Sequence, residues 1–72
     1  MREHYFSADL IQTDPILAYF DYKHLPSNLQ GVSALFANFA ELLYDDVPRS
    51  AERTMAFRKL LEAKDCAIRA AL

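Results

Sequence analysis

The apolar positions of this 72-residue chain fall into two long stretches with helical spacing. In the first stretch, apolar residues recur at intervals of three, four and seven, which is the spacing of one face of an α-helix. They are Leu29, Val32, Phe36, Phe39, Ala40, Leu43 and Val47. Leu35 and Leu42 widen this face onto a second flank, more than a contact with a single helix requires. We therefore predict a helix over residues 26–46 that packs on its neighbour and also on another chain.

The second stretch predicts a helix over residues 50–71 that carries cations on its apolar side. At ~100° per residue, one stripe of this helix contains Phe57, Leu60, Leu61, Ile68 and Ala71. Arg53, Thr54 and Lys64 fall within the same stripe. A buried charge that loses its partner costs ~3–5 kcal/mol. We therefore expect this face to meet an anion, a carboxylate of a neighbour, or both.

The segments around these helices set the predicted architecture. Residues 45–50 interrupt the helical pattern, Ser50 or a near neighbour is expected to cap the next helix, and Glu52 suits its first turn. A short loop between long helices makes them antiparallel neighbours. Residues 1–24 are rich in aromatic residues: Asp14-Pro15 suits a helix start, with a short helix through about Tyr19, but residues 18–23 would also suit an extended arm.

We thus predict one all-α domain over residues 1–72, consisting of an N-terminal arm or short helix (1–24) and an antiparallel helical hairpin (26–46 and 50–71). A chain this short buries little surface on its own. It is nevertheless 53% hydrophobic, and we expect it to assemble into a compact homo-oligomer.

Composition and charge limit the compartment and the partners that we expect for this protein. Cys66 is the single cysteine, so an intrachain disulfide is excluded, and we expect a bystander thiol in a reducing compartment. No apolar run reaches the ~20 residues of a membrane-spanning helix, so we expect a cytoplasmic protein that does not contact membranes. Residues 1–48 carry two cations against seven acids (net −5), and residues 49–72 carry six cations against three acids (net +3). This balance does not favour DNA binding.

Catalytic and metal-binding motifs are not found. Histidine, serine and aspartate occur without a spacing that indicates a catalytic site, and glycine-rich phosphate loops are absent. Asp45-Asp46 fits an acidic loop cap better than a metal pair. We predict no enzymatic activity, no metal and no cofactor.

Two clusters suit an anionic ligand. The first is Arg49, Ser50, Arg53 and Thr54, which surround a predicted helix N-terminus where backbone N–H groups favour phosphate. The alternative is that these arginines pair with Glu52 or with residues 45–46 as ordinary surface charges.

The second cluster is Tyr22, Lys23 and His24. An aromatic ring beside a cation suits a nucleobase with its phosphate. The alternative here is that Tyr22 packs the N-terminal segment onto the hairpin while Lys23 is solvated.

Several of these segments together resemble a family of small bacteriophage proteins, the helical-hairpin sponges of the anti-CBASS type 2 and anti-Thoeris kind. The resemblance covers roughly residues 20–71 and is carried by Phe20-Asp-Tyr22, His24-Leu-Pro26, Pro48-Arg-Ser-Ala-Glu-Arg-Thr54 and Leu60-Leu-Glu-Ala-Lys-Asp65. In the family the arm motif often reads aromatic-x-Tyr-His-x-Pro, whereas Lys23 separates Tyr22 from His24 in this chain.

The resemblance implies a homo-oligomer, hexameric in the anti-CBASS branch, in the cytoplasm of an infected bacterial host cell. Such proteins sequester cyclic di- and trinucleotide messengers without cleaving them, in pockets between subunits, and so antagonise CBASS-type antiviral signalling. By this resemblance Tyr22 stacks on a base, Lys23 contacts phosphate with His24 beside it, and Arg53 and Thr54 form an anion site with Arg49 nearby. The alternative is a regulatory module that binds a helix of another protein through Leu35, Phe39, Leu42 and Met55.

Overall fold

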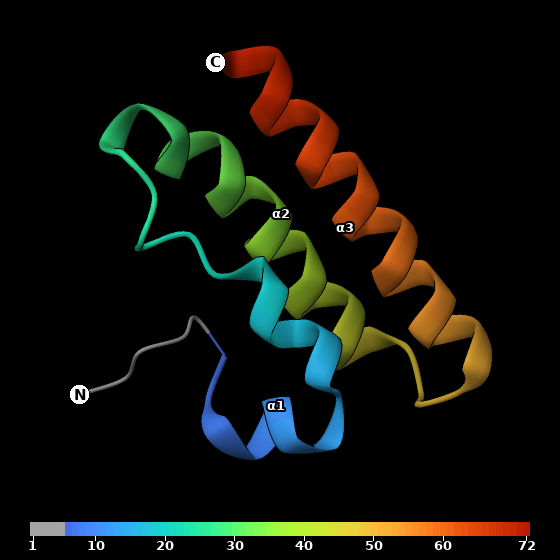
Figure 1. Ribbon diagram of the computed structural model, residues 1–72. Helices are drawn as coiled ribbons and strands as arrows, with labels where there is room; N and C mark the ends of the chain where they lie inside the picture. The colour runs from blue at the N-terminus through green and yellow to red at the C-terminus, as the bar shows by residue number, and fades with distance from the viewer. Residues whose placement is uncertain (1–5) are drawn as a thin grey trace.

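The two apolar stretches form two long helices that lie side by side in a computed structural model, which describes residues 6–72 (Figure 1). Helix α2 spans Ser27–Asp46 and helix α3 spans Ala51–Ala71. They are preceded by a short α-helix, α1 (Ala8–Thr13), and a 3₁₀-helix, η1 (Pro15–Phe20). The described residues form no strand, so the predicted all-α class is confirmed.

Local sequence signals explain where the long helices begin and end. Pro26 immediately precedes α2, as suits a residue with a fixed φ and no N–H to satisfy. Val47 adopts an extended conformation that ends α2. At the start of α3, the Oγ of Ser50 accepts a hydrogen bond from the backbone N–H of Arg53 at 3.1 Å, as an N-cap should. The predicted cap at Ser50 is confirmed.

The N-terminal segment folds back across the two long helices. Helix η1 contacts both α2 and α3, and α1 packs on η1 (Figure 1). Asp14-Pro15 does begin a helix, and it runs through Phe20 as a 3₁₀-helix. The α1 helix was not anticipated, because six residues are too few for a periodic signal. Residues 1–5, part of the predicted arm, lie outside the described residues.

The core lies where η1 meets α2 and α3. Its buried apolar residues are Phe6, Leu17, Phe20, Ala37, Ala40 and Phe57. The rings of Phe20 and Phe57 meet edge to face, with centroids 6.4 Å apart. Phe39 was predicted to share the buried stripe, but it is 56% exposed. Since small Ala37 and Ala40 lie under the N-terminal segment, the buried side of α2 turns away from Phe39.

Candidate functional site

The loop end of the molecule is organised around the buried side chain of Arg53. This residue is 6% exposed, and its Nη2 forms a salt bridge of 2.9 Å with the Oδ2 of Asp14, which is equally buried. Its Nη1 donates hydrogen bonds to the carbonyl oxygens of Val47 (3.0 Å) and Tyr44 (3.4 Å). The guanidinium also lies 4.9 Å from the centre of the Tyr44 ring. Arg53 therefore connects the first turn of α3, the last turn of α2 and the junction between α1 and η1.

The expectation that cations lie on the apolar side of the last helix is confirmed for Arg53 and Lys64, both of which are buried. The counter-charge of Arg53 comes from Asp14 of the same chain, 39 positions away. Thr54 was placed on the same stripe, and this placement is wrong because Thr54 is exposed. Its hydroxyl donates to the backbone oxygen of Ser50, at the margin of the helix rather than against the core.

The other predicted residue at this end, Arg49, is exposed and donates a hydrogen bond of 3.2 Å to the carbonyl of Thr13. The pairing of Arg49 or Arg53 with Glu52, Asp45 or Asp46 that was considered as an alternative is not what the described contacts show. The three predicted residues at this end therefore bond to different parts of the backbone or to Asp14. None of the three lines the pocket described below.

The segment between η1 and α2 presents the second predicted cluster. Tyr22 is half-buried and packs against the core, whereas Lys23 and His24 are exposed. The side-chain amide of Gln30 holds this segment to α2 by donating a 2.9 Å hydrogen bond to the carbonyl of Leu25. Tyr22 thus packs as the alternative interpretation of this cluster expected. Of the three predicted residues, only Lys23 and His24 are exposed.

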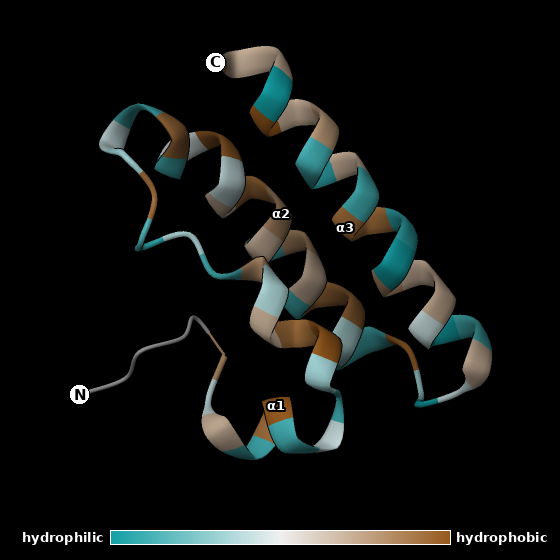
Figure 2. Cartoon of the chain, in the orientation of Figure 1, coloured by the Kyte–Doolittle hydropathy of each residue, from teal (hydrophilic) through white to brown (hydrophobic). Residues whose placement is uncertain are grey.

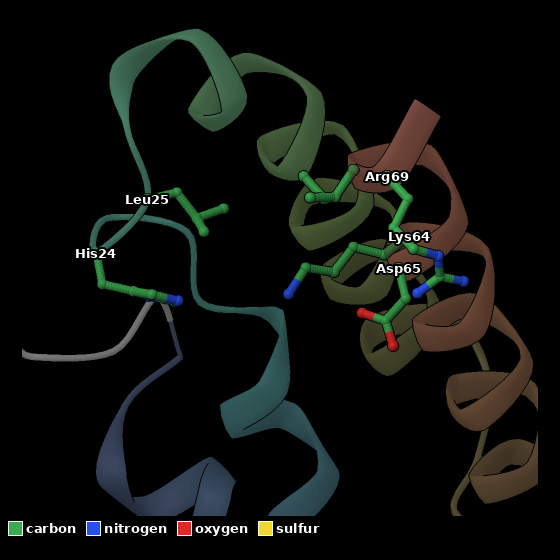
Figure 3. A pocket seen from close by; sticks show the side chains of 6 residues that line it. His24, Leu25, Lys64, Asp65 and Arg69 are labelled. Atoms are coloured by element: carbon green, nitrogen blue, oxygen red, sulfur yellow. The ribbon is translucent and has the colours of Figure 1, made fainter. Parts of the chain in front are cut away.

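His24 reaches a pocket that lies between this segment and the C-terminal half of α3. The pocket has a volume of about 280 Å³ and is lined by His24, Leu25, Lys64, Asp65, Ile68 and Arg69. Figure 3 shows His24 and Lys64 extending toward each other from opposite sides, with Asp65 and Arg69 beside Lys64 on α3. Three basic side chains and one carboxylate therefore line the same opening.

Lys64 is the buried member of this group. It is 8% exposed, and its ammonium donates a hydrogen bond to the carbonyl of Tyr19, near the end of η1. Burial lowers the pKa of Lys64 from its ordinary value, because desolvation disfavours the charged form; the charges of Asp65 and Asp21 act in the opposite direction. A lysine in these surroundings gains from any additional negative charge that enters the pocket.

The predicted site residues therefore divide between two places. Arg53 and Lys64 are eleven positions apart on α3, which corresponds to ~16 Å along the helix axis at 1.5 Å per residue. His24 lies at the pocket with Lys64, and Arg49, Arg53 and Thr54 lie at the opposite end of α3. Arg69, which the sequence analysis did not select as a site residue, also lines the pocket. Nothing in the sequence indicates that His24 and Arg69 line the same pocket, because this depends on how residues 21–26 lie against α3.

Other kinds of site are not indicated by residues 6–72. Within this part of the chain no three histidine, cysteine or acidic side chains come together as metal ligands would. None of its helices combines the length and apolar character needed to cross a bilayer. Comparison with protein-family models, with curated proteins and with solved structures produced no match to this chain. The pocket geometry is therefore the main observation on which a function can be argued.

Proposed function

We propose that this protein binds cyclic oligonucleotides and sequesters them without cleaving them, with the pocket of His24, Lys64 and Arg69 as part of the binding site. The observation that carries the proposal is that these three basic residues line one opening, where His24 and Lys64 extend toward each other from segments that are 40 positions apart in the sequence. The resemblance to the anti-CBASS and anti-Thoeris sponges supports the same ligand class and the antagonism of CBASS-type signalling.

Each part of the pocket suits one part of such a ligand. An arginine such as Arg69 offers paired N–H donors to a phosphate, and a lysine ammonium contributes a point charge. The apolar side chains of Leu25 and Ile68 lie beside them and suit the face of a nucleobase or sugar. The carboxylate of Asp65 repels phosphate, but it accepts hydrogen bonds from a base amino group or a ribose hydroxyl.

The size of the pocket bears on how the ligand is held. A volume of about 280 Å³ is at the lower limit of the ~300–1,000 Å³ of ordinary small-molecule sites. It suits one nucleotide of a cyclic di- or trinucleotide. The rest of the ligand would then contact a second copy of the chain, which agrees with the expected homo-oligomer. The hexamer that the resemblance implies is part of this proposal.

Calorimetric titration with a panel of cyclic di- and trinucleotides tests the proposal, and chromatography of the recovered ligand tests whether it stays intact. We expect Arg69→Ala to weaken binding about tenfold or more, because a hydrogen bond to a charged group contributes ~1.5–3 kcal/mol. Arg58→Ala is the matched control, since Arg58 is an exposed arginine of the same helix that does not line the pocket. Absence of binding across the panel would refute the proposal, and conversion of the ligand would indicate an enzyme.

A second candidate function rests on a different observation. Leu35, Phe39 and Leu42 of α2 are each more than half exposed, and Met55 of α3 is 47% exposed. Exposed apolar rows of this kind are typical of protein-binding surfaces. A protein-interaction module would use this face and leave the basic pocket unoccupied, so ligand titration distinguishes the two functions.

A further inference from the structure

One side of α2 exposes a row of large apolar side chains. Leu35, Phe39 and Leu42, here called the α2 outer face, are 67%, 56% and 61% exposed. Their spacing of four and three positions places them on one side of the helix. A groove of about 330 Å³ continues this face toward the end of α2 and is lined by Phe39, Leu42, Leu43, Asp46 and Val47. Figure 2 shows α2 brown or pale over most of its length, whereas strongly hydrophilic teal recurs along α3.

Burial of this face is favourable for a physical reason. Single exposed apolar residues are common on soluble proteins, but three large ones in a row with an adjoining groove form a continuous patch. Removal of each of these side chains from water is favourable in proportion to the apolar area that is covered. The intrachain contacts of α2 use its other side, where Ala37 and Ala40 are completely buried.

The charges of α2 indicate how a partner helix would be oriented. The acidic residues of this helix, Glu41, Asp45 and Asp46, all lie in its last six positions, and the rest of the helix carries no formal charge. Two copies of α2 placed in parallel would bring these carboxylates together. Two antiparallel copies place the carboxylates of one beside the uncharged N-terminal half of the other, which keeps the like charges apart.

We infer that the α2 outer face binds the same face of a second copy of this chain, with the two α2 helices antiparallel about a two-fold axis. The row is centred between positions 38 and 39, so Leu35 of each copy lies opposite Leu42 of the other. Phe39 then lies next to the axis, and Asp46 lies opposite Gly31. A Cβ added at Gly31 would meet no atom within 4 Å, so the surface there is open to a close approach. A two-fold contact of this kind is self-complementary and closed.

This inference deepens the homo-oligomer part of the proposed function, and it does not depend on a ligand. A single helix pair buries an area at the low end of stable interfaces, so we expect reversible, concentration-dependent association of the full chain. Sedimentation equilibrium without ligand measures it. We expect Phe39→Asp to weaken association at least about 30-fold, which corresponds to ~2 kcal/mol. Leu72→Asp, the same kind of change at an apolar residue that is 83% exposed and lies outside this face, should leave the association constant unchanged.

Disulfide trapping in a Cys66→Ser background tests the orientation. A mixture of Leu35→Cys and Leu42→Cys chains should form a mixed disulfide, and Leu35→Cys alone should form little. Strong self-crosslinking of Leu35→Cys would indicate parallel helices and overturn the arrangement. Far-UV circular dichroism of each variant checks that the helices are retained.

The remaining outcomes are equally decisive. A chain that stays monomeric at all concentrations overturns the inference and leaves the face to a different protein. Association that survives Phe39→Asp but is lost in Leu72→Asp also overturns it. A larger assembly that Phe39→Asp divides into smaller units supports it. Sedimentation without ligand reports on this face, and titration of Arg69→Ala reports on the pocket, so either proposal can fail without the other.

Discussion

The two buried cations of α3 are held in different ways at the two ends of the molecule. Arg53, at the loop end, has a carboxylate partner at 2.9 Å, two backbone carbonyl acceptors and a neighbouring aromatic ring. Lys64 donates to the neutral carbonyl of Tyr19, and its burial lowers its pKa. The first cation is neutralised inside the chain. The second is held at the wall of a pocket where charge is only partly compensated.

This difference indicates that one cation stabilises the fold and the other is suited to binding a ligand. A guanidinium that is already paired and buried gains little from a ligand, and a ligand would have to displace Asp14 to reach it. An ammonium beside an opening gains electrostatic energy from an anion that enters. We therefore assign Arg53 to the stability of the fold and Lys64 to the candidate site. The helical spacing placed both residues on one stripe, and the sequence analysis selected Arg53, not Lys64, as a site residue.

The largest effect is expected from removal of the partner of Arg53. Asp14→Ala leaves a buried guanidinium without its carboxylate, and such a loss costs ~3–5 kcal/mol. Urea unfolding followed by circular dichroism measures the change in the free energy of unfolding. Asp9→Ala is the control, because Asp9 is an exposed acid of α1, and it should change stability by no more than ~0.5 kcal/mol. Equal effects in the two variants would contradict the structural role of the ion pair.

Replacement of Lys64, the buried cation at the pocket end of α3, tests the other half of this comparison. We expect Lys64→Met to weaken binding of cyclic oligonucleotides about tenfold through loss of a charged contact. Its stability should change by only ~1 kcal/mol, because the lost hydrogen bond is offset by the desolvation that the methionine avoids. Lys59→Met is the control, since Lys59 is 68% exposed and pairs with Glu62 on the surface. If Lys64→Met unfolded the protein while binding of the folded fraction stayed intact, the two cations would have the same role.

A smaller effect is expected from the cap that precedes Arg53. Ser50→Ala removes the hydroxyl that accepts the backbone N–H of Arg53, and loss of an N-cap costs ~1 kcal/mol. Thermal unfolding of this variant should show a lower midpoint. Thr54→Ala, which removes a hydroxyl bonded to a carbonyl in the same turn, should have the smaller effect. The reverse order would mean that Ser50 does not act as the cap.

The helices could be predicted from the sequence because their signals are local. Apolar spacing, Pro26 and Ser50 together indicate the two long helices without reference to distant residues. The same spacing placed Arg53 and Lys64 on the buried side of α3, where they are found.

The pairing of these side chains could not be predicted in the same way. Arg53 meets Asp14 across 39 positions and Lys64 meets Tyr19 across 45, and both contacts depend on how α1 and η1 fold back. The helical spacing also could not show that Phe39 lies outside the buried side of α2. Which side of a helix is buried depends on which segment covers it. Arg69 was missed as a pocket residue for the same reason.

The smallest effect is expected from alkaline pH, and it concerns Lys64 alone. Because burial lowers its pKa in the folded protein from the ordinary value of 10.5, the folded state releases the Lys64 proton at a lower pH than the unfolded state. In the window below 10.5 the unfolded state therefore binds more protons, and this group's contribution to stability rises with pH. The stability of the natural chain relative to Lys64→Met should rise as pH approaches 10.5 and level off above it. A relative stability of the natural chain that falls toward 10.5 would mean that the folded state favours charged Lys64, and the contrast between the two ends of α3 would be lost.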